Sequence, residues 1–225
     1  MPRSKPNRRK SGITLADLRK PSVLALVAAN LFPLYGVLAF GWEVFPLIFL
    51  FWLENVIIGI FNVFRMLSVS PYDRKTWKAK AFMVPFFCVH YGMFTAVHGI
   101  FVMALFGGYG QEGAPFPGPG AVVESVRHFG LVLPAAILFL SHGFSFASNF
   151  VGKKEYRTTS VDDLMARPYA RIILLHLTLI FGGFLLQALG SPLGGLLLFL
   201  TIKIVFDLKA HLRERSAAGS RTPLP

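Results

Sequence analysis

Residues 45–67 read FPLIFLFWLENVIIGIFNVFRML. Before Arg65, near its end, this stretch carries a single charged residue, Glu54. A helix needs about 20 mostly apolar residues to cross the hydrocarbon core of a bilayer. In lipid, a helix also satisfies its backbone polar groups with its own hydrogen bonds. The stretch therefore predicts a transmembrane α-helix.

Five further segments have a similar length and apolar character: 22–41, 81–106, 130–151, 169–189 and 193–210. Charged residues make up only 15% of the 225-residue chain, whereas a soluble domain usually has about 25%. The predicted fold class is therefore all-α, a polytopic membrane helical bundle of about six transmembrane helices.

The basic residues predict the orientation of the spans, because Lys- and Arg-rich connections stay on the cytoplasmic side. With the N-terminus inside, 21 of the 23 Lys and Arg residues fall in cytoplasmic segments. Both termini are therefore predicted to be cytoplasmic. The membrane domain is predicted over residues 21–212, between a basic, partly disordered tail (1–20) and a C-terminal tail (213–225).

Two cytoplasmic segments are predicted to form short surface helices that lead into spans. Thr14 precedes Asp17, and Ser160 precedes Asp163, each at the spacing of a capping box. The outer segment 108–120 is rich in Gly and Pro and is predicted to be irregular.

Charged and histidine side chains occur inside the predicted spans, where a charge at mid-span costs on the order of 2.5–3.5 kcal/mol. We expect them to avoid lipid and to face the interior of the bundle. At a rise of about 1.5 Å per residue, most of them lie between the midplane and the cytoplasmic side. They are Glu54, His90, His98, His142, His176, Lys203 and Asp207.

One interpretation of these residues is a divalent-metal site. Imidazole and carboxylate groups are standard ligands of zinc and iron, and such a site would make the protein a possible membrane metalloenzyme. The expected ligands are Glu54, His90, His142 and His176.

Two other interpretations stay open. Intramembrane Asp, Glu and His side chains commonly relay protons or ions in transporters and channels; the further candidates for that role are Lys203, Asp207 and His98. Lys203 and Asp207 are one helical turn apart and are expected to form an ion pair. Alternatively, the protein is structural, and its polar and small residues only pack helices together.

Helical spacing adds supporting polar residues to the same faces. Asn55 follows Glu54 and lies two turns before Asn62, while Tyr91 follows His90. Ser145 and Asn149 lie one and two turns after His142.

Motifs of known reactions are missing: the chain has neither HExxH nor GxxxxGK[ST]. Three short motifs do occur, namely Trp52–Leu53–Glu54–Asn55, His90–Tyr91–Gly92 and Ser141–His142–Gly143. They resemble the motifs of an uncharacterised family of bacterial multi-pass membrane proteins without an assigned activity. The resemblance runs from the second span onward. It implies a location in the bacterial cytoplasmic (inner) membrane and no reaction.

The expected surroundings are the lipid bilayer and, at the cytoplasmic face, anionic lipid headgroups that attract the basic segments. Nucleic acid is not an expected partner, because the basic residues are divided among short segments beside apolar runs. The sequence does not assign an oligomeric state. The single cysteine, Cys88, lies in an apolar run, so we expect a packing residue and no intrachain disulfide.

The predicted topology can be tested with reporter domains. A reporter fused after Arg215 or inserted near Lys154 should be cytoplasmic, and one inserted near Gly113 should be external, because the loop around Gly113 lacks basic residues. Green fluorescent protein and alkaline phosphatase report the two locations. Cytoplasmic fluorescence from the Gly113 insertion would contradict the arrangement of six spans.

Overall fold

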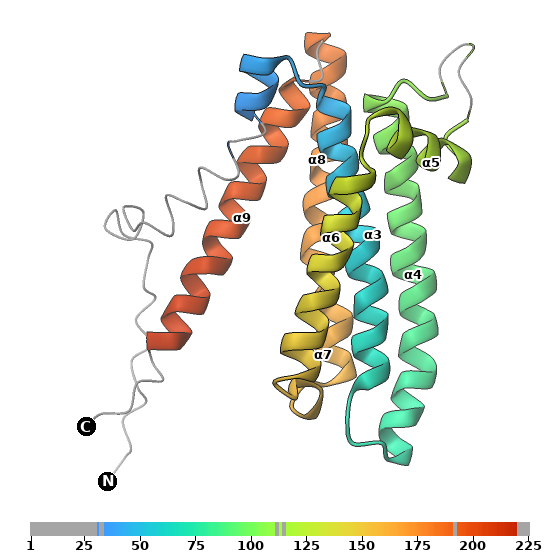
Figure 1. Ribbon diagram of the computed structural model, residues 1–225, viewed down its shortest axis with the longest axis vertical. Coiled ribbons are helices and arrows are strands. Elements are labelled where there is room, and N and C mark those ends of the chain that lie inside the picture. Colours follow the sequence, from blue (N-terminus) through green and yellow to red (C-terminus); the bar gives the residue numbers. More distant parts are fainter. Residues whose placement is uncertain (1–30, 32–33, 111–112, 114–115, 191–192, 220–225) are drawn as a thin grey trace.

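The computed structural model describes residue 31 and residues 34–110, 113, 116–190 and 193–219. In these residues the chain is all-α (Figure 1). The elements, in order, are α3 (Val44–Ser68), α4 (Arg74–Phe106), α5 (Pro119–His128), α6 (Val132–Ser145), the π-helical turn η1 (Phe146–Val151), the 3₁₀ turn η2 (Glu155–Arg157), α7 (Val161–Ala166), α8 (Tyr169–Leu189) and α9 (Leu193–Gly219).

Four helical stretches of the described chain are long and apolar enough to cross a membrane: Val44–Ser68, Arg74–Phe106, Val132–Val151 and Val161–Leu189. The apolar part of α9 is shorter, from Leu193 to Val205. The expectation of an all-α protein with long apolar helices is confirmed. Most of the predicted first span, 22–41, and the tail that contains Thr14 and Asp17 lie outside the described residues.

Helix α3 lies at the centre of the bundle and contacts α4, α6, α7, α8 and α9 (Figure 1). One end of the core is built around the fully buried side chains of Phe49, Leu175 and Leu196. The other end surrounds Met66 and Leu164. Because lipid is as apolar as these side chains, close packing rather than the hydrophobic effect holds such helices together.

Helices α3 and α4 approach closely because glycines lie under aromatic rings. A Cβ atom at Gly59 would lie 2.7 Å from the Tyr91 ring, and one at Gly99 would lie 2.5 Å from the Trp52 ring. Trp52 also donates a hydrogen bond from Nε1 to the carbonyl of Thr95 at 2.8 Å. These contacts fix the pairing of α3 with α4.

The short surface helix that the sequence predicts after Ser160 is present as α7, with one face exposed and the other packed on the bundle. The capping box is present, since Ser160 Oγ accepts from the Asp163 amide at 3.1 Å and the Asp163 carboxylate accepts from the Ser160 amide. However, Leu164 is fully buried, and its carbonyl accepts a hydrogen bond from Asn62 Nδ2 at 2.9 Å. Helix α7 packs against α3 and α4, and α8, which follows it, contacts the same two helices.

The described residues of 108–118 are irregular, as predicted. Helix α5 follows them and was not predicted; Pro119 opens it, where its missing N–H costs nothing. Tyr109 on the preceding turn lies 3.1 Å from Ser125 of this helix, oxygen to oxygen. Cys88 is exposed on α4 instead of packed, because α3 covers the neighbouring face that contains Tyr91.

Lys80, predicted to be one of the cytoplasmic basic residues, is only 2% exposed. Its ammonium donates to the carbonyls of Leu67 and Val69, each at 2.7 Å. The last carbonyls of a helix have no partner within it, so Lys80 of α4 caps the C-terminal end of α3. The ammonium also lies 4.5 Å from the ring centroid of Tyr72 and 4.9 Å from that of Trp77.

Replacing Lys80 by Met should lower the thermal midpoint of the detergent-purified protein, because two carbonyls lose a charged donor. Hydrogen bonds to charged groups contribute about 1.5–3 kcal/mol each. Lys78→Met is the matched control, since Lys78 is exposed on the same helix. Equal midpoints for the two variants, measured by intrinsic fluorescence, would contradict the capping role of Lys80.

Candidate functional site

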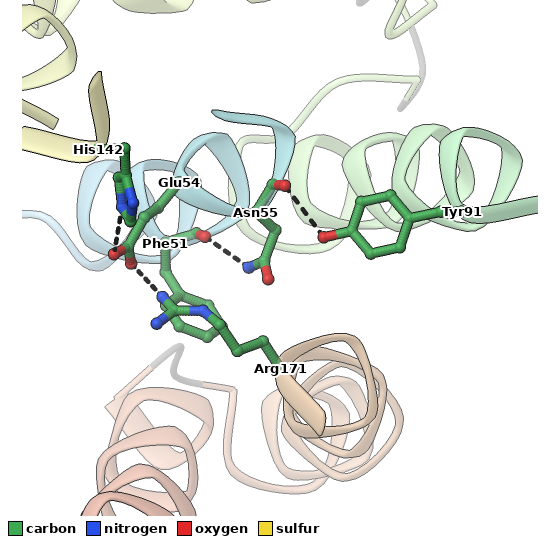
Figure 2. A network of polar contacts seen from close by, with 6 residues as sticks. All are labelled: Phe51, Glu54, Asn55, Tyr91, His142 and Arg171. Carbon is green, nitrogen blue, oxygen red and sulfur yellow. Dashed lines mark hydrogen bonds and ion pairs between the residues drawn. The ribbon is translucent and has the colours of Figure 1, made fainter. Parts of the chain in front are cut away.

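The Glu54 side chain lies on the side of α3 that faces α6 and α8. Its neighbours Phe51, Trp52 and Asn55 are buried against other helices, whereas the Glu54 side chain keeps 21% of its surface exposed. Figure 2 shows the carboxylate between a side chain of α6 and a side chain of α8. It is therefore the point where three helices meet through polar groups.

Arg171 of α8 is the first partner of Glu54. Its guanidinium NH2 group donates to Glu54 Oε2, and the two groups form a salt bridge (Figure 2). The guanidinium carbon lies 5.2 Å from the ring centroid of Phe51, within the range of a cation–π contact.

His142 of α6 is the second partner. Its Nε2 atom lies 3.3 Å from Glu54 Oε1. An ionised carboxylate only accepts hydrogen bonds, so Nε2 must carry the hydrogen. Gly143, which follows His142, brings α6 close to α3, because a Cβ atom there would lie 3.3 Å from the Phe61 ring. Nδ1 of His142 makes no hydrogen bond with the part of the chain that the structure describes.

A cavity of about 490 Å³ lies beside this network, between α3, α6 and α9. Helix α9 leans away from the bundle toward its C-terminal end (Figure 1). The cavity walls are apolar except for Glu54 and Lys203. Lys203 is half-buried, and the side chain of Asp207 lies outside the described residues, so the expected ion pair between the two stays a prediction.

The other predicted histidines lie between α4 and α8. His90 Nδ1 is 2.7 Å from the hydroxyl of Tyr169. His98 Nε2 is 2.9 Å from His176 Nδ1. His98 is 3% exposed, whereas His176 is exposed. The sequence predicts these residues inside the bundle, and only His98 is fully buried.

Four expected metal ligands, Glu54, His90, His142 and His176, are thus divided among three separate contacts. No group of three or more His, Cys, Asp and Glu side chains in the described part of the chain is arranged to hold a metal ion. The expectation that these four converge is not met, because α4 presents His90 and His98 to α8 rather than to α6. Metal binding itself stays a prediction.

The supporting polar residues also form separate contacts rather than one cluster. Asn55 donates to the carbonyl of Phe51 at 2.7 Å, and Tyr91 donates to the carbonyl of Asn55 at 3.0 Å (Figure 2). Asn62 holds α7, and Asn149 contacts Ser145 within one turn at 3.4 Å. Asn55, Asn62 and Tyr91 thus bond to backbone carbonyls, the kind of contact that the structural interpretation expects.

Sequence reasoning missed Arg171 and Tyr169. Both lie in the first turn of α8, and Arg171 was assigned to the cytoplasmic boundary. The capping box of Ser160 and Asp163 was a signal for this position. It indicates that the helical run begins at about residue 161 rather than at Pro168, which places Arg171 about two turns further from the start of the run.

Comparisons with known proteins add a family but no activity. A family model described as a family of unknown function (DUF6498) matches residues 13–223. No curated protein and no solved structure matches the chain.

Removing one partner of the Glu54–Arg171 pair should destabilise the protein. Breaking a fully buried pair costs about 3–5 kcal/mol, and replacing both partners with apolar residues is often neutral. Both side chains here are partly exposed. We therefore expect Glu54→Leu and Arg171→Met each to lower the thermal midpoint, but by less than the loss of a fully buried pair would.

The double variant should recover most of the loss. Ser148→Ala is a control for substitution near the site, because the Ser148 hydroxyl bonds only within its own helix, to the carbonyl of Phe144. Strictly additive losses in the double variant would show that the two groups do not depend on each other.

Proposed function

The chain belongs to DUF6498, a family of unknown function, and we propose that it is a proton-handling protein of the bacterial cytoplasmic membrane. In this proposal six helices cross the bilayer, both termini are cytoplasmic, and Glu54 and His142 exchange protons within the membrane. The observation that carries it is the contact of one carboxylate with Arg171 and His142, from two other helices.

The proton path follows from the hydrogen-bonding capacity of the groups. Arg171 stays protonated and neutralises the charge of the carboxylate. His142 donates from Nε2 to Glu54 and keeps Nδ1 for a second partner. A proton that arrives at Nδ1 allows the proton on Nε2 to pass to Glu54 Oε1, and the return step reverses this transfer. Imidazole suits this role because its charge changes near neutral pH.

The exposed surface of Glu54 and His142 distinguishes them from the polar groups that only pack helices. Asn55 and Asn62 are almost completely buried and bond to backbone carbonyls. Glu54 and His142 keep 21% and 24% of their side-chain surface, and Glu54 lines the cavity beside α9. A proton donor or acceptor can therefore reach them without unfolding the bundle.

A divalent metal is the second candidate, favoured by the contact of an imidazole with a carboxylate at 3.3 Å. Glu54 and His142 would supply two ligands, and zinc or iron suits both. His90 and His176 would have to leave their present partners to join them. Metal analysis of the purified protein tests this candidate directly, and near-stoichiometric metal lost in both Glu54→Gln and His142→Gln would favour it.

Proton handling is tested with purified protein in liposomes that contain a pH-sensitive dye. After a pH jump, protein-containing vesicles should equilibrate faster than empty ones. His142→Gln and Glu54→Gln should each lower the excess rate by about tenfold or more, since a positioned proton-transfer group typically contributes about 10²–10⁴-fold.

Ser148→Ala should leave the rate unchanged and controls for reconstitution. Wild-type vesicles that equilibrate no faster than empty vesicles would contradict the proposal. Equal rates in the wild type and in both Gln variants would assign any proton flux to another part of the protein.

A further inference from the structure

We infer that water reaches Glu54 from the outer side of the membrane, along a path that begins beside Glu43 at the start of α3. This path deepens the proposed function and rests on it, because the proposed topology makes the end of the bundle that carries α5 and the start of α3 the external one (Figure 1). The path gives the proposed proton exchange a route and a side of entry.

The first observation is that two cavities adjoin along α3. The cavity that Glu54 lines has a volume of about 490 Å³, and a second cavity of about 360 Å³ lies at the start of the same helix. Leu47 and Leu50, which are one helical turn apart, line both of them. The second cavity extends to residues 41–43, which are exposed. Together the cavities form a path from exposed residues to Glu54, which lies about 15 Å from the start of α3.

The second observation is that ionisable side chains lie along this path. Glu54 and Lys203 line the larger cavity, and Glu43 lines the smaller one. Within the described chain, Glu43 makes no side-chain hydrogen bond that caps α3, so its exposed carboxylate stays at the entrance. Ionisable groups at membrane depth face the bundle interior or a water-filled cavity, because their charge is costly in hydrocarbon. The larger cavity has room for on the order of ten water molecules, so water rather than lipid fills it.

The third observation is a group of aromatic rings on the opposite side of the site. Phe61 lies two turns after Glu54 on α3 and is buried. Its ring centroid lies 5.2 Å from that of Phe139 and 6.1 Å from that of Phe146. Phe139 and Phe146 lie one turn before and one turn after His142, on the same face. These rings pack between the two helical runs on the cytoplasmic side of the contact between Glu54 and His142, so the site opens toward the outer end.

Cysteine labelling tests the path without a measurement of proton flux. Replacing the only cysteine by Cys88→Ser gives a full-length chain without thiols. In this background, Leu50→Cys places a thiol on the wall of both cavities, about 9 Å from the start of α3. A membrane-impermeant, positively charged methanethiosulfonate added to intact cells should modify this thiol from the outside, because the reactive thiolate forms in water and not in hydrocarbon.

Two further variants in the same background are controls. Leu140 lies on α6 at a similar depth, about 12 Å from the start of that helix. It is 68% exposed but belongs to the described walls of neither cavity. Leu140→Cys should therefore react at least about tenfold more slowly than Leu50→Cys, since a thiol that faces lipid forms little thiolate. Lys78→Cys, exposed near the opposite end of the bundle, should react only in inside-out vesicles and controls for sidedness.

Equal rates for Leu50→Cys and Leu140→Cys, or modification of Leu50→Cys only in inside-out vesicles, would overturn the path. If Leu50→Cys does not fold, Leu47→Cys takes its place, because Leu47 lines both cavities one turn nearer the entrance. External labelling of Leu50→Cys without excess proton flux in wild-type liposomes would support the path and contradict the proposed function. Proton flux without labelling of either variant would overturn the path and leave the proposed function in place.

Discussion

The arrangement of this bundle depends on one constraint, that a polar group removed from water must find its partner inside the protein. Glu54 forms a salt bridge with Arg171 across the interface of α3 and α8, and Lys80 donates hydrogen bonds to the last carbonyls of α3. Asn62 donates a hydrogen bond to a carbonyl of α7. Each contact joins two elements, so together these contacts determine which faces of the helices meet, while the apolar side chains fill the space between them.

The same constraint separates the polar groups that only pack helices from those available for function. Asn55 and Asn62 bond to backbone carbonyls and are almost completely buried. Glu54 and His142 are also bonded, but both keep part of their surface exposed, and Glu54 lines a cavity. We expect replacement of the first kind to affect stability alone. The proposed function rests on the second kind because these groups are the ones that keep accessible surface.

The long apolar helices could be predicted because length and hydropathy decide whether a segment forms a span. The stretch 45–67 coincides with α3 almost from end to end. Helical spacing assigns each polar residue to a face but does not identify the helix that covers that face. His90 and His98 therefore could not be assigned to α8. The contact of α7 with α3, which includes a long-range bond from Asn62 to the Leu164 carbonyl, could not be assigned either.

Arg171 also helps to decide between the two candidate functions, because its positive charge is compatible with proton exchange at Glu54 but opposes metal binding there. In proton exchange, its fixed positive charge balances the ionised carboxylate, and a proton that passes from His142 to Glu54 moves within the cluster without changing its total charge. In metal binding, the guanidinium competes with the cation for the same carboxylate oxygens, and a ligand set at Glu54 would have to displace it. An arginine already paired with the only glutamate of α3 therefore favours proton exchange over a resident metal at this position.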